Sequence, residues 1–191
     1  MRVISGSCKG RKLSSPPGKE IRPTSDMLKG MLFNILAPQI VDSHFVDLCA
    51  GSGAIGIEAV SRGAALATFV ESSAEALTVL RRNIEICRIA ERCQVIAGDV
   101  RSLGSRWHYA TAVDIVYFDP PYHSDMYDAV LRQITSASWL NADALVIVEH
   151  HREQRLNSRY AAFTCYRHSV YGLSQLSFYR RESEESKVER S

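Results

Sequence analysis

The feature that most constrains the fold is an alternation of short apolar segments with helical patterns across residues 45–149. The apolar segments that we expect to form strands are residues 45–49, 67–70, 94–97, 113–119 and 144–149. The apolar spacing of helices occurs at residues 54–63, 73–90 and 125–137, with a weaker pattern near 101–107. This alternation predicts an α/β protein with a mostly parallel central sheet and helices on both faces. Active sites in such sheets lie at the carboxyl ends of the strands.

The segments on either side predict smaller additions to this sheet. Residues 156–180 contain two strand patterns around Tyr171-Gly172, which would complete a seven-stranded sheet as an antiparallel hairpin. Residues 1–43 predict a small extension, made of a β-hairpin (residues 2–5 and 11–14), a loop and a helix. We therefore divide the chain into that extension, a main domain of residues 44–181, and a polar tail, 182–191, that we expect to be disordered.

The composition of the 191 residues is that of an ordinary globular domain, with 46% hydrophobic and 23% charged residues. No apolar run approaches the roughly 20 residues that a membrane-spanning helix needs, and we find no secretory leader. The five cysteines are odd in number and lack the Cys-x-x-Cys spacing of a zinc site. We therefore expect a cytoplasmic protein without a metal, whose cysteines pack as small hydrophobic residues.

Positive charge is concentrated towards the two ends of the chain. Residues 1–30 carry seven Lys or Arg and two acids, and residues 151–181 carry six Arg and one acid. This distribution favours a polyanionic partner, although ordinary solvated surface charge would also account for it. Lys9, Arg11 and Lys12 lie on and after the expected hairpin turn, where they would contact nucleic-acid phosphates.

An unusual tetrapeptide, Asp119-Pro120-Pro121-Tyr122, follows the apolar segment at residues 113–118. Two prolines cannot continue a central strand, because each lacks a backbone N–H donor and has φ fixed near −65°. The chain therefore leaves the sheet in a rigid bend, where a carboxylate, a backbone carbonyl and an aromatic ring could hold a planar group that carries an amine. A proline turn that only ends the strand is the alternative interpretation.

Residues 46–56, VDLCAGSGAIG, predict a strand that enters a glycine-rich turn and then a helix. The glycines have the Gly-x-Gly-x-x-Gly spacing that dinucleotide sites and S-adenosylmethionine sites share. Asp47 favours the second ligand, because a carboxylate would repel a pyrophosphate but attract a sulfonium and an ammonium. Gly51 and Gly53 would let the turn approach a ligand closely, and Gly56 would let the helix pack near the sheet.

Acidic residues come at the ends of four consecutive predicted strands, which we interpret as parts of one cofactor site. Glu71 is placed to accept hydrogen bonds from both ribose hydroxyls, and Asp99 to accept from the adenine amino group. Each acid alone would more often cap a helix or end a turn. Together with Asp47 and Asp119, they favour S-adenosylmethionine over a nicotinamide cofactor. The predicted cofactor contacts in these segments are Asp47, Ala50, Gly51, Ser52, Gly53, Glu71, Asp99 and Val100.

Methyl transfer would explain why a bend that holds an amine lies beside such a cofactor. The reaction is an in-line displacement, so the protein must align a nitrogen lone pair with the sulfonium methyl group. The exocyclic amine of a base is conjugated and is a poor nucleophile. Hydrogen bonds from its two N–H groups to the Asp119 carboxylate and the Pro120 carbonyl would favour a pyramidal nitrogen and stabilise the developing positive charge. Tyr122 would stack on the base, worth ~1–3 kcal/mol, and neither a metal nor a strong base is required.

Several segments of the chain resemble the RsmD family of methyltransferases. They are residues 2–6 (RVISG), 9–13 (KGRKL), 22–26 (RPTSD), 32–36 (LFNIL), 50–59 (AGSGAIGIEA), 61–64 (SRGA), 69–71 (FVE), 171–172 (YG) and 178–181 (FYRR). The resemblance covers about residues 1–181 and implies a Rossmann-like class I methyltransferase fold. It also implies methylation of the exocyclic N2 amine of one guanine, guanine 966, in 16S ribosomal RNA of the assembled small subunit. It further implies that Arg22 and Thr24 line the methionine end of the cofactor, with Arg22 also near the RNA.

Two other functions share many of these features. A DNA adenine-N6 methyltransferase has the same tetrapeptide and motif order, but it would normally contain a target-recognition insertion, and the stretch from Asp99 to Asp119 is short. A non-catalytic ribosome-assembly factor could keep the fold, but loss of Asp119 or of the glycines would mark it, and both are present. We expect a monomer, because no apolar surface stripe is left over.

A few single residues complete the predictions. Cys49 and Lys29-Gly30 depart from the family pattern, which commonly has phenylalanine and an Arg-Glu pair at these positions. Phe33 is expected in the core and Asn34 on a helix surface. The adjacent residues His150 and His151 are expected on the surface rather than in a site.

Overall fold

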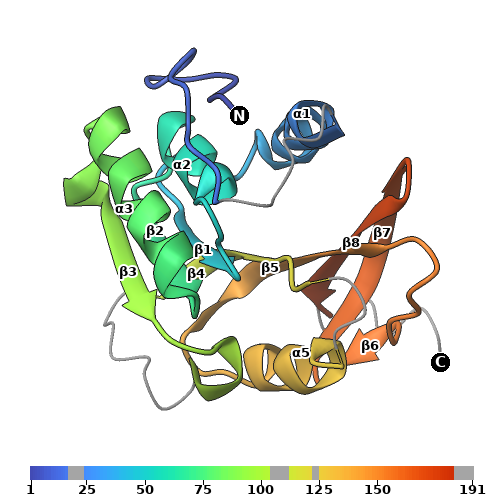
Figure 1. Ribbon diagram of the computed structural model, residues 1–191. Coiled ribbons are helices and arrows are strands. Elements are labelled where there is room, and N and C mark those ends of the chain that lie inside the picture. The colour runs from blue at the N-terminus through green and yellow to red at the C-terminus, as the bar shows by residue number, and fades with distance from the viewer. Residues whose placement is uncertain (17–23, 104–111, 122–124, 183–191) are drawn as a thin grey trace, which may run out of the picture.

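The computed structural model describes residues 1–16, 24–103, 112–121 and 125–182. Its centre is one eight-stranded sheet with the strand order β3-β2-β1-β4-β5-β8-β7-β6 (Figure 1). The strands are β1 (His44–Leu48), β2 (Leu66–Glu71), β3 (Cys93–Ala97), β4 (Val113–Phe118), β5 (Leu140–His151), β6 (Arg159–Tyr160), β7 (Phe163–Tyr171) and β8 (Ser174–Arg181). The five strands β1 to β5 are parallel, and β6, β7 and β8 join antiparallel.

This topology confirms the predicted mostly parallel sheet that ends in an antiparallel hairpin. The predicted seven strands were one too few, because the two residues of β6 pair with the start of β7 and form an eighth strand. A pairing of two residues is too short to produce an apolar alternation, so the sequence pattern carries no signal for it. The strand β5 also begins four residues earlier and ends two residues later than predicted.

Helices cover both faces of the sheet, as predicted. They are α1 (Thr24–Leu36), α2 (Ala54–Ser61), α3 (Ala74–Cys87) and α5 (Tyr127–Thr135), with short 3₁₀ turns η1 (Ala90–Arg92) and η2 (Val100–Ser102). Figure 1 shows α1, α2 and α3 on one side of the sheet and α5 on the other. Successive side chains of a strand point to opposite faces of the sheet, and β1 shows the result. Phe45 packs with the apolar residues of α1, whereas Val46 and Leu48 pack with those of α5.

The N-terminal segment differs from the predicted hairpin. Its two arms form one antiparallel bridge, Arg2 with Lys12, rather than paired strands in the part of the chain that the structure describes, with hydrogen bonds from the Val3 N–H to the Arg11 carbonyl and from the Leu13 N–H to the Met1 carbonyl (3.0 Å each). The residues between the arms contact α2 instead: the backbone N–H of Ser7 donates to the Ser61 carbonyl (2.8 Å). Val3 and Leu13 are buried in the same cluster as α2 and α3. The segment is therefore packed onto the sheet domain, and a separate unit at residues 1–43 stays a prediction.

Two of the single-residue predictions can be checked directly. Phe33 is buried and its ring lies 6.3 Å from that of Phe45, and Asn34 is exposed, as predicted. The surface position predicted for His150 was wrong, because this residue is 1% exposed and its Nε2 lies 2.8 Å from the Ser177 hydroxyl. Burial lowers the pKa of His150, so the ring is neutral at pH 7. None of the described helices is long and apolar enough to cross a membrane.

Candidate active site

The loop between β1 and α2 forms the centre of the candidate site. Three of its residues have positive φ: Cys49 at 61°, Gly51 at 57° and Gly53 at 77°. A Cβ atom at Gly53 would lie 2.2 Å from Leu80 Cδ1, so this position requires glycine for both its conformation and its space. These torsions bend the chain sharply where the strand ends, which brings the backbone N–H groups of the loop to the edge of the sheet.

Gly56 allows the close packing of α2 that the sequence predicted. A Cβ atom there would lie 2.4 Å from Cε1 of Phe69, a residue of β2. The helix therefore lies against the neighbouring strand, and its first turn is held beside the end of β1.

Asp47, on β1, holds this turn through a buried hydrogen bond to the first turn of α2. Its side chain is fully buried, and its Oδ2 accepts a hydrogen bond from the Gly56 N–H (2.9 Å). Burial raises the pKa of Asp47 to about 8, with a smaller contribution from the nearby Glu71. The carboxyl group is therefore mostly protonated at pH 7. In this position it supports the loop, and direct contact with a cofactor stays a prediction.

Glu71 links the loop after β1 to the end of β2. Its Oε2 accepts from the Gly51 N–H (2.7 Å), and its Oε1 accepts from the N–H groups of Ser72 and Ser73 (2.8 Å each). Three backbone donors therefore hold the carboxylate in one orientation at the edge of the sheet.

Asp99 lies after β3, at the more exposed side of the site. Its carboxylate accepts from the backbone N–H of Arg101 (2.8 Å) and from the Arg101 guanidinium (2.6 Å at Nη2). These hydrogen bonds hold the pKa of Asp99 below its usual value, so it carries a full negative charge. The following residue, Val100, is buried beneath it.

The tetrapeptide begins immediately after β4. The Asp119 N–H donates to the Leu48 carbonyl (3.4 Å), which places the start of the bend beside the end of β1. Asp119 is half-buried, Pro120 is buried and Pro121 is exposed. Below them, the buried Tyr117 hydroxyl donates to the Glu149 carboxylate. The predicted stacking residue Tyr122 lies outside the described residues.

The four predicted acids meet around Cys49. Burial is the largest cause that raises the pKa of the Cys49 thiol to about 12; the carboxylates of Glu71, Asp119, Asp47 and Asp99, all ionised at the alkaline pH where this thiol titrates, contribute less, in that order. All four carboxyl groups thus act on one side chain, although they come from four different strands. The sheet brings the predicted set together at its carboxyl edge, where the sequence placed it.

The predicted RNA contacts in the N-terminal segment lie elsewhere. Lys9, Arg11 and Lys12 are exposed. The turn that carries Lys9 packs where α2 and α3 end, since the Cys8 N–H donates to the Ser61 hydroxyl and its Sγ contacts the Cys87 carbonyl. Because these helices run antiparallel to the strands, their ends lie at the edge opposite the four acids. The RNA-binding role of these residues stays a prediction.

The sequence analysis also assigned cofactor contacts to Arg22 and Thr24, and a contact with RNA to Arg22. Arg22 lies outside the described residues, and Thr24 begins α1. Both assignments stay predictions.

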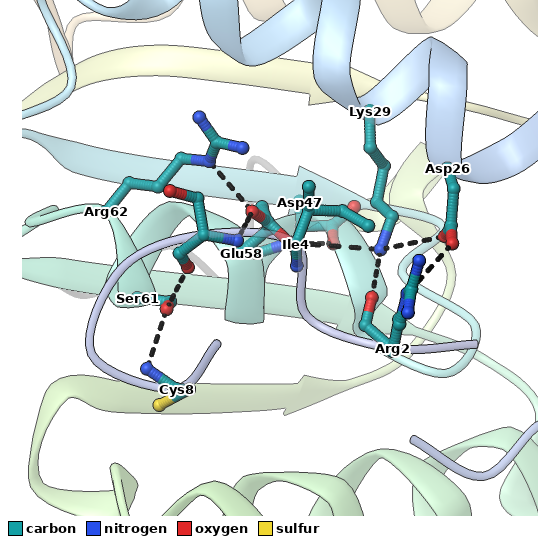
Figure 2. Close-up of polar contacts among 11 residues, drawn as sticks. Arg2, Ile4, Cys8, Asp26, Lys29, Asp47, Glu58, Ser61 and Arg62 are labelled. Carbon is teal, nitrogen blue, oxygen red and sulfur yellow. Dashed lines mark hydrogen bonds and ion pairs between the residues drawn. The ribbon is translucent and has the colours of Figure 1, made fainter. Parts of the chain in front are cut away.

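A buried ionic network that the sequence analysis missed connects the N-terminal segment, α1 and α2. Figure 2 shows Glu58 at its centre, with Lys29 on one side and Arg62 on the other. Glu58 is 0% exposed, and it accepts from the backbone N–H groups of Ile4 (2.8 Å) and Ser5 (3.0 Å) and from Arg62 Nε (2.8 Å). An acid in the otherwise apolar segment 54–61 was the available sequence signal.

Lys29 completes this network from α1. Its Nζ lies 3.8 Å from Glu58 and 3.7 Å from Asp26, and it donates to the Arg2 carbonyl (2.6 Å). Burial lowers the pKa of Lys29, while the charges of Glu58 and Asp26 oppose this change.

Asn83 is a second residue that the sequence analysis missed. It is fully buried on α3, its Oδ1 accepts from the Ser14 N–H (2.9 Å), and its Nδ2 donates to the carbonyls of Ser52 (2.9 Å) and Ser14 (3.0 Å). It therefore holds the glycine-rich loop and the N-terminal segment against the same helix. A polar residue within the apolar stripe of residues 77–87 was the available signal. Among the described residues, no group of three or more His, Cys, Asp or Glu could hold a metal ion.

Comparison with known proteins agrees with this geometry. The family described as "Conserved hypothetical protein 95" matches residues 1–180. Ribosomal RNA small subunit methyltransferase D of Escherichia coli (strain K12) is 34% identical over 184 residues, 96% of this chain and 91% of that protein. YlbH of Bacillus subtilis (strain 168) is 34% identical over 182 residues, 95% of this chain and 99% of YlbH.

A solved structure extends the match to three dimensions. The structure of yhhF from Escherichia coli has a TM-score of 0.84 at 34% identity, and the match covers 96% of this chain and 99% of that chain. The agreement therefore includes the sheet, the helices and nearly the whole sequence. From the family match, the identity to its relatives and the shared Rossmann-like fold, we conclude that the chain belongs to the RsmD family of methyltransferases.

Proposed function

We propose that this protein transfers a methyl group from S-adenosylmethionine to the exocyclic N2 amine of a guanine in 16S ribosomal RNA. The observation that carries the proposal is the convergence of Glu71, Asp99 and Asp119 at the carboxyl edge of the sheet. Glu71 accepts from the Gly51 N–H (2.7 Å), the Asp119 N–H donates to the Leu48 carbonyl (3.4 Å), and the N–H of Gly98, which precedes Asp99, donates to the Glu71 carbonyl (2.8 Å). Negative charge there favours a ligand with cationic groups and disfavours a pyrophosphate. The names of the curated relatives support a ribosomal RNA substrate.

The residues at this edge have the chemistry to hold S-adenosylmethionine, which when bound would supply the methyl group. A carboxylate offers about four acceptor positions, and Glu71 uses three for backbone N–H groups, which leaves one position for one of the two ribose hydroxyls that the sequence analysis assigned to it. Asp99 would accept from the adenine amino group if the exposed Arg101 guanidinium gave up one of its contacts. Asp47 would keep the loop in place from below.

The target amine would bind at the bend after β4. The Asp119 carboxylate and the Pro120 carbonyl would accept its two N–H groups, which directs the nitrogen lone pair towards the methyl group and stabilises the positive charge that develops. The rigidity of the two prolines keeps these acceptors in place before the base arrives. We further propose that the protein acts as a cytoplasmic monomer on the assembled small subunit, with Lys9, Arg11, Lys12 and Arg22 contacting RNA and Tyr122 stacking on the base.

Methyl transfer can be measured with radiolabelled S-adenosylmethionine and three substrates: unmodified small subunits, naked 16S RNA and DNA. We expect label in N2-methylguanosine, and loss of transfer with retained cofactor binding in the Asp119→Asn variant. Asp143→Asn, at an exposed position on β5, is the matched control and should transfer at the wild-type rate. Label in N6-methyladenine of DNA, or RNA binding without transfer, would contradict the proposal.

A further inference from the structure

An open groove lies between α1 and the β7–β8 hairpin. Its volume is about 780 Å³, which is within the range of ligand-binding clefts. Its walls include Met27, Met31, Asn34 and Ile35 from α1 and Arg167 and Tyr171 from β7. Figure 1 shows α1 near the end of the β7–β8 hairpin, whose strands belong to the sheet.

The surface of the groove is apolar and aromatic but carries positive charge. Met27 is 62% exposed, and its sulfur accepts from the Tyr171 hydroxyl (2.8 Å) across one end of the groove. Arg167 lies over the Phe178 ring (5.9 Å), and beside it Arg180 lies over the ring of Tyr166 (4.8 Å), which is 42% exposed. These cation–π contacts keep the two guanidinium groups beside aromatic rings of the hairpin.

Neither arginine is neutralised by an acid within the described part of the chain. The ion pairs found there include neither Arg167 nor Arg180, and the described residues that line the groove include no Asp or Glu. The nearby Asp26 is paired with Arg2 and Lys29, and Glu149 accepts from Ser174 (3.1 Å). The groove is therefore a site of net positive charge.

The strand register places one end of the groove at the carboxyl edge of the sheet. Tyr171 pairs with Ser174, and Ser174 pairs with His151 at the end of β5. Strand β5 is the neighbour of β4, whose end carries Asp119. The Tyr171 end of the groove thus lies at the same edge as the bend that would hold the target amine, and from there the groove continues to Arg167, which pairs with Phe178 in the middle of the sheet. The turn at Lys9 lies at the opposite edge.

We propose that this groove binds the unpaired RNA nucleotides that flank the target base, an inference that rests on the proposed function. Bases of a single strand stack on aromatic rings and guanidinium planes, and phosphates pair with arginines, so Tyr171 and Arg167 match both parts of a nucleotide. The exposed amide of Asn34 adds a hydrogen-bonding group for a base edge. A protein segment would fit the apolar wall, but the unpaired arginines favour a polyanion.

Binding can be measured by fluorescence anisotropy with a short labelled single-stranded RNA, and with a duplex of the same sequence, over a range of salt concentrations. Tyr171→Leu should weaken single-strand binding about tenfold because stacking is lost, whereas Tyr171→Phe, which keeps the ring, should stay within about twofold. Arg167→Gln should lower the salt slope by about 0.7, the value for one phosphate contact of a single strand. Arg132→Gln, at an exposed position on α5, is the matched control and should change neither quantity.

The inference would be overturned if Tyr171→Leu and Arg167→Gln both kept the wild-type affinity and salt slope. It would also be overturned if the variants weakened binding of the duplex as much as binding of the single strand. In methyl transfer, Tyr171→Leu should raise KM for RNA and leave kcat unchanged. If the variants bind naked RNA normally but lose activity on assembled subunits, the groove holds a protein and the RNA assignment is wrong. If the wild type methylates no guanine while the binding effects are present, the proposed function fails and the groove assignment stands.

Discussion

Removal of the Glu58 carboxylate should destabilise the protein strongly, because this fully buried group is the centre of an ionic network. Glu58→Ala would leave the Ile4 and Ser5 N–H groups without their acceptor and would remove the carboxylate that faces Lys29 and Arg62. Lys29 is 1% exposed and cannot reach water without rearrangement of α1. Breaking a buried ion pair by removing one partner costs about 3–5 kcal/mol.

This loss is large compared with the total stability of a domain, about 5–15 kcal/mol. Urea denaturation should therefore show a clear fall in the midpoint for Glu58→Ala. The matched control is Glu85→Ala, at an exposed position on α3, which should change the free energy of unfolding by no more than about 0.5 kcal/mol. Hydrogen exchange at the Ile4 and Ser5 amides should accelerate in the Glu58 variant alone, because these donors become free.

A double-mutant cycle separates the ion pair from the general effect of truncation. Lys29→Met removes the charge and keeps most of the volume, so Glu58→Ala in that background no longer leaves a buried ammonium with Asp26 as its one acidic partner among the described residues. We expect the two changes to be non-additive by about 1–3 kcal/mol. Additive effects, or a loss below about 1 kcal/mol for Glu58→Ala, would refute the role assigned to this network.

Three further predictions concern single positions. Gly53→Ala should lower the melting temperature, since it places a side chain at positive φ and 2.2 Å from Leu80; an unchanged melting curve would contradict the tight turn. Gly30→Ala should instead raise the free energy of unfolding in urea by about 1 kcal/mol, because the new methyl group meets no atom within 4 Å and alanine favours the helix. Asp47 has a folded pKa near 8 against 3.8 when unperturbed, so its contribution to stability is complete at low pH and is lost as the pH rises to about 8. Asp47→Asn keeps an acceptor for the Gly56 N–H and cannot ionise. Its urea midpoint should therefore increase relative to that of the wild type between pH 5 and pH 9. A difference between the two midpoints that stays constant with pH would contradict the assigned pKa.

The parts of the site that were predictable from sequence are those encoded in short contiguous segments. The loop after β1 needs glycine where φ is positive, and the bend after β4 needs proline, so the residues themselves report the backbone that they form. The acids Glu71, Asp99 and Asp119 were recognisable because each directly follows an apolar strand. Parallel strands bring their carboxyl ends to one edge, so the convergence of these acids followed from the strand pattern alone.

Other features required contacts between distant residues. Glu58 and the Ile4 N–H are separated by 54 positions, and Asn83 and Ser14 by 69 positions. A burial pattern does not state which partner a polar residue meets, because the pairing depends on how helices and loops pack after the chain has folded.

The environment of His150 and the groove beside α1 also depend on contacts between distant residues. His150 has no apolar side chain, but its position on a strand between β4 and β8 buries it. The groove exists because α1 packs beside β7, a strand that begins more than 120 residues later in the chain. Local periodicity therefore established the sheet, the glycine-rich loop and the edge that carries the acids, and long-range packing established the buried network and the positively charged groove beside them.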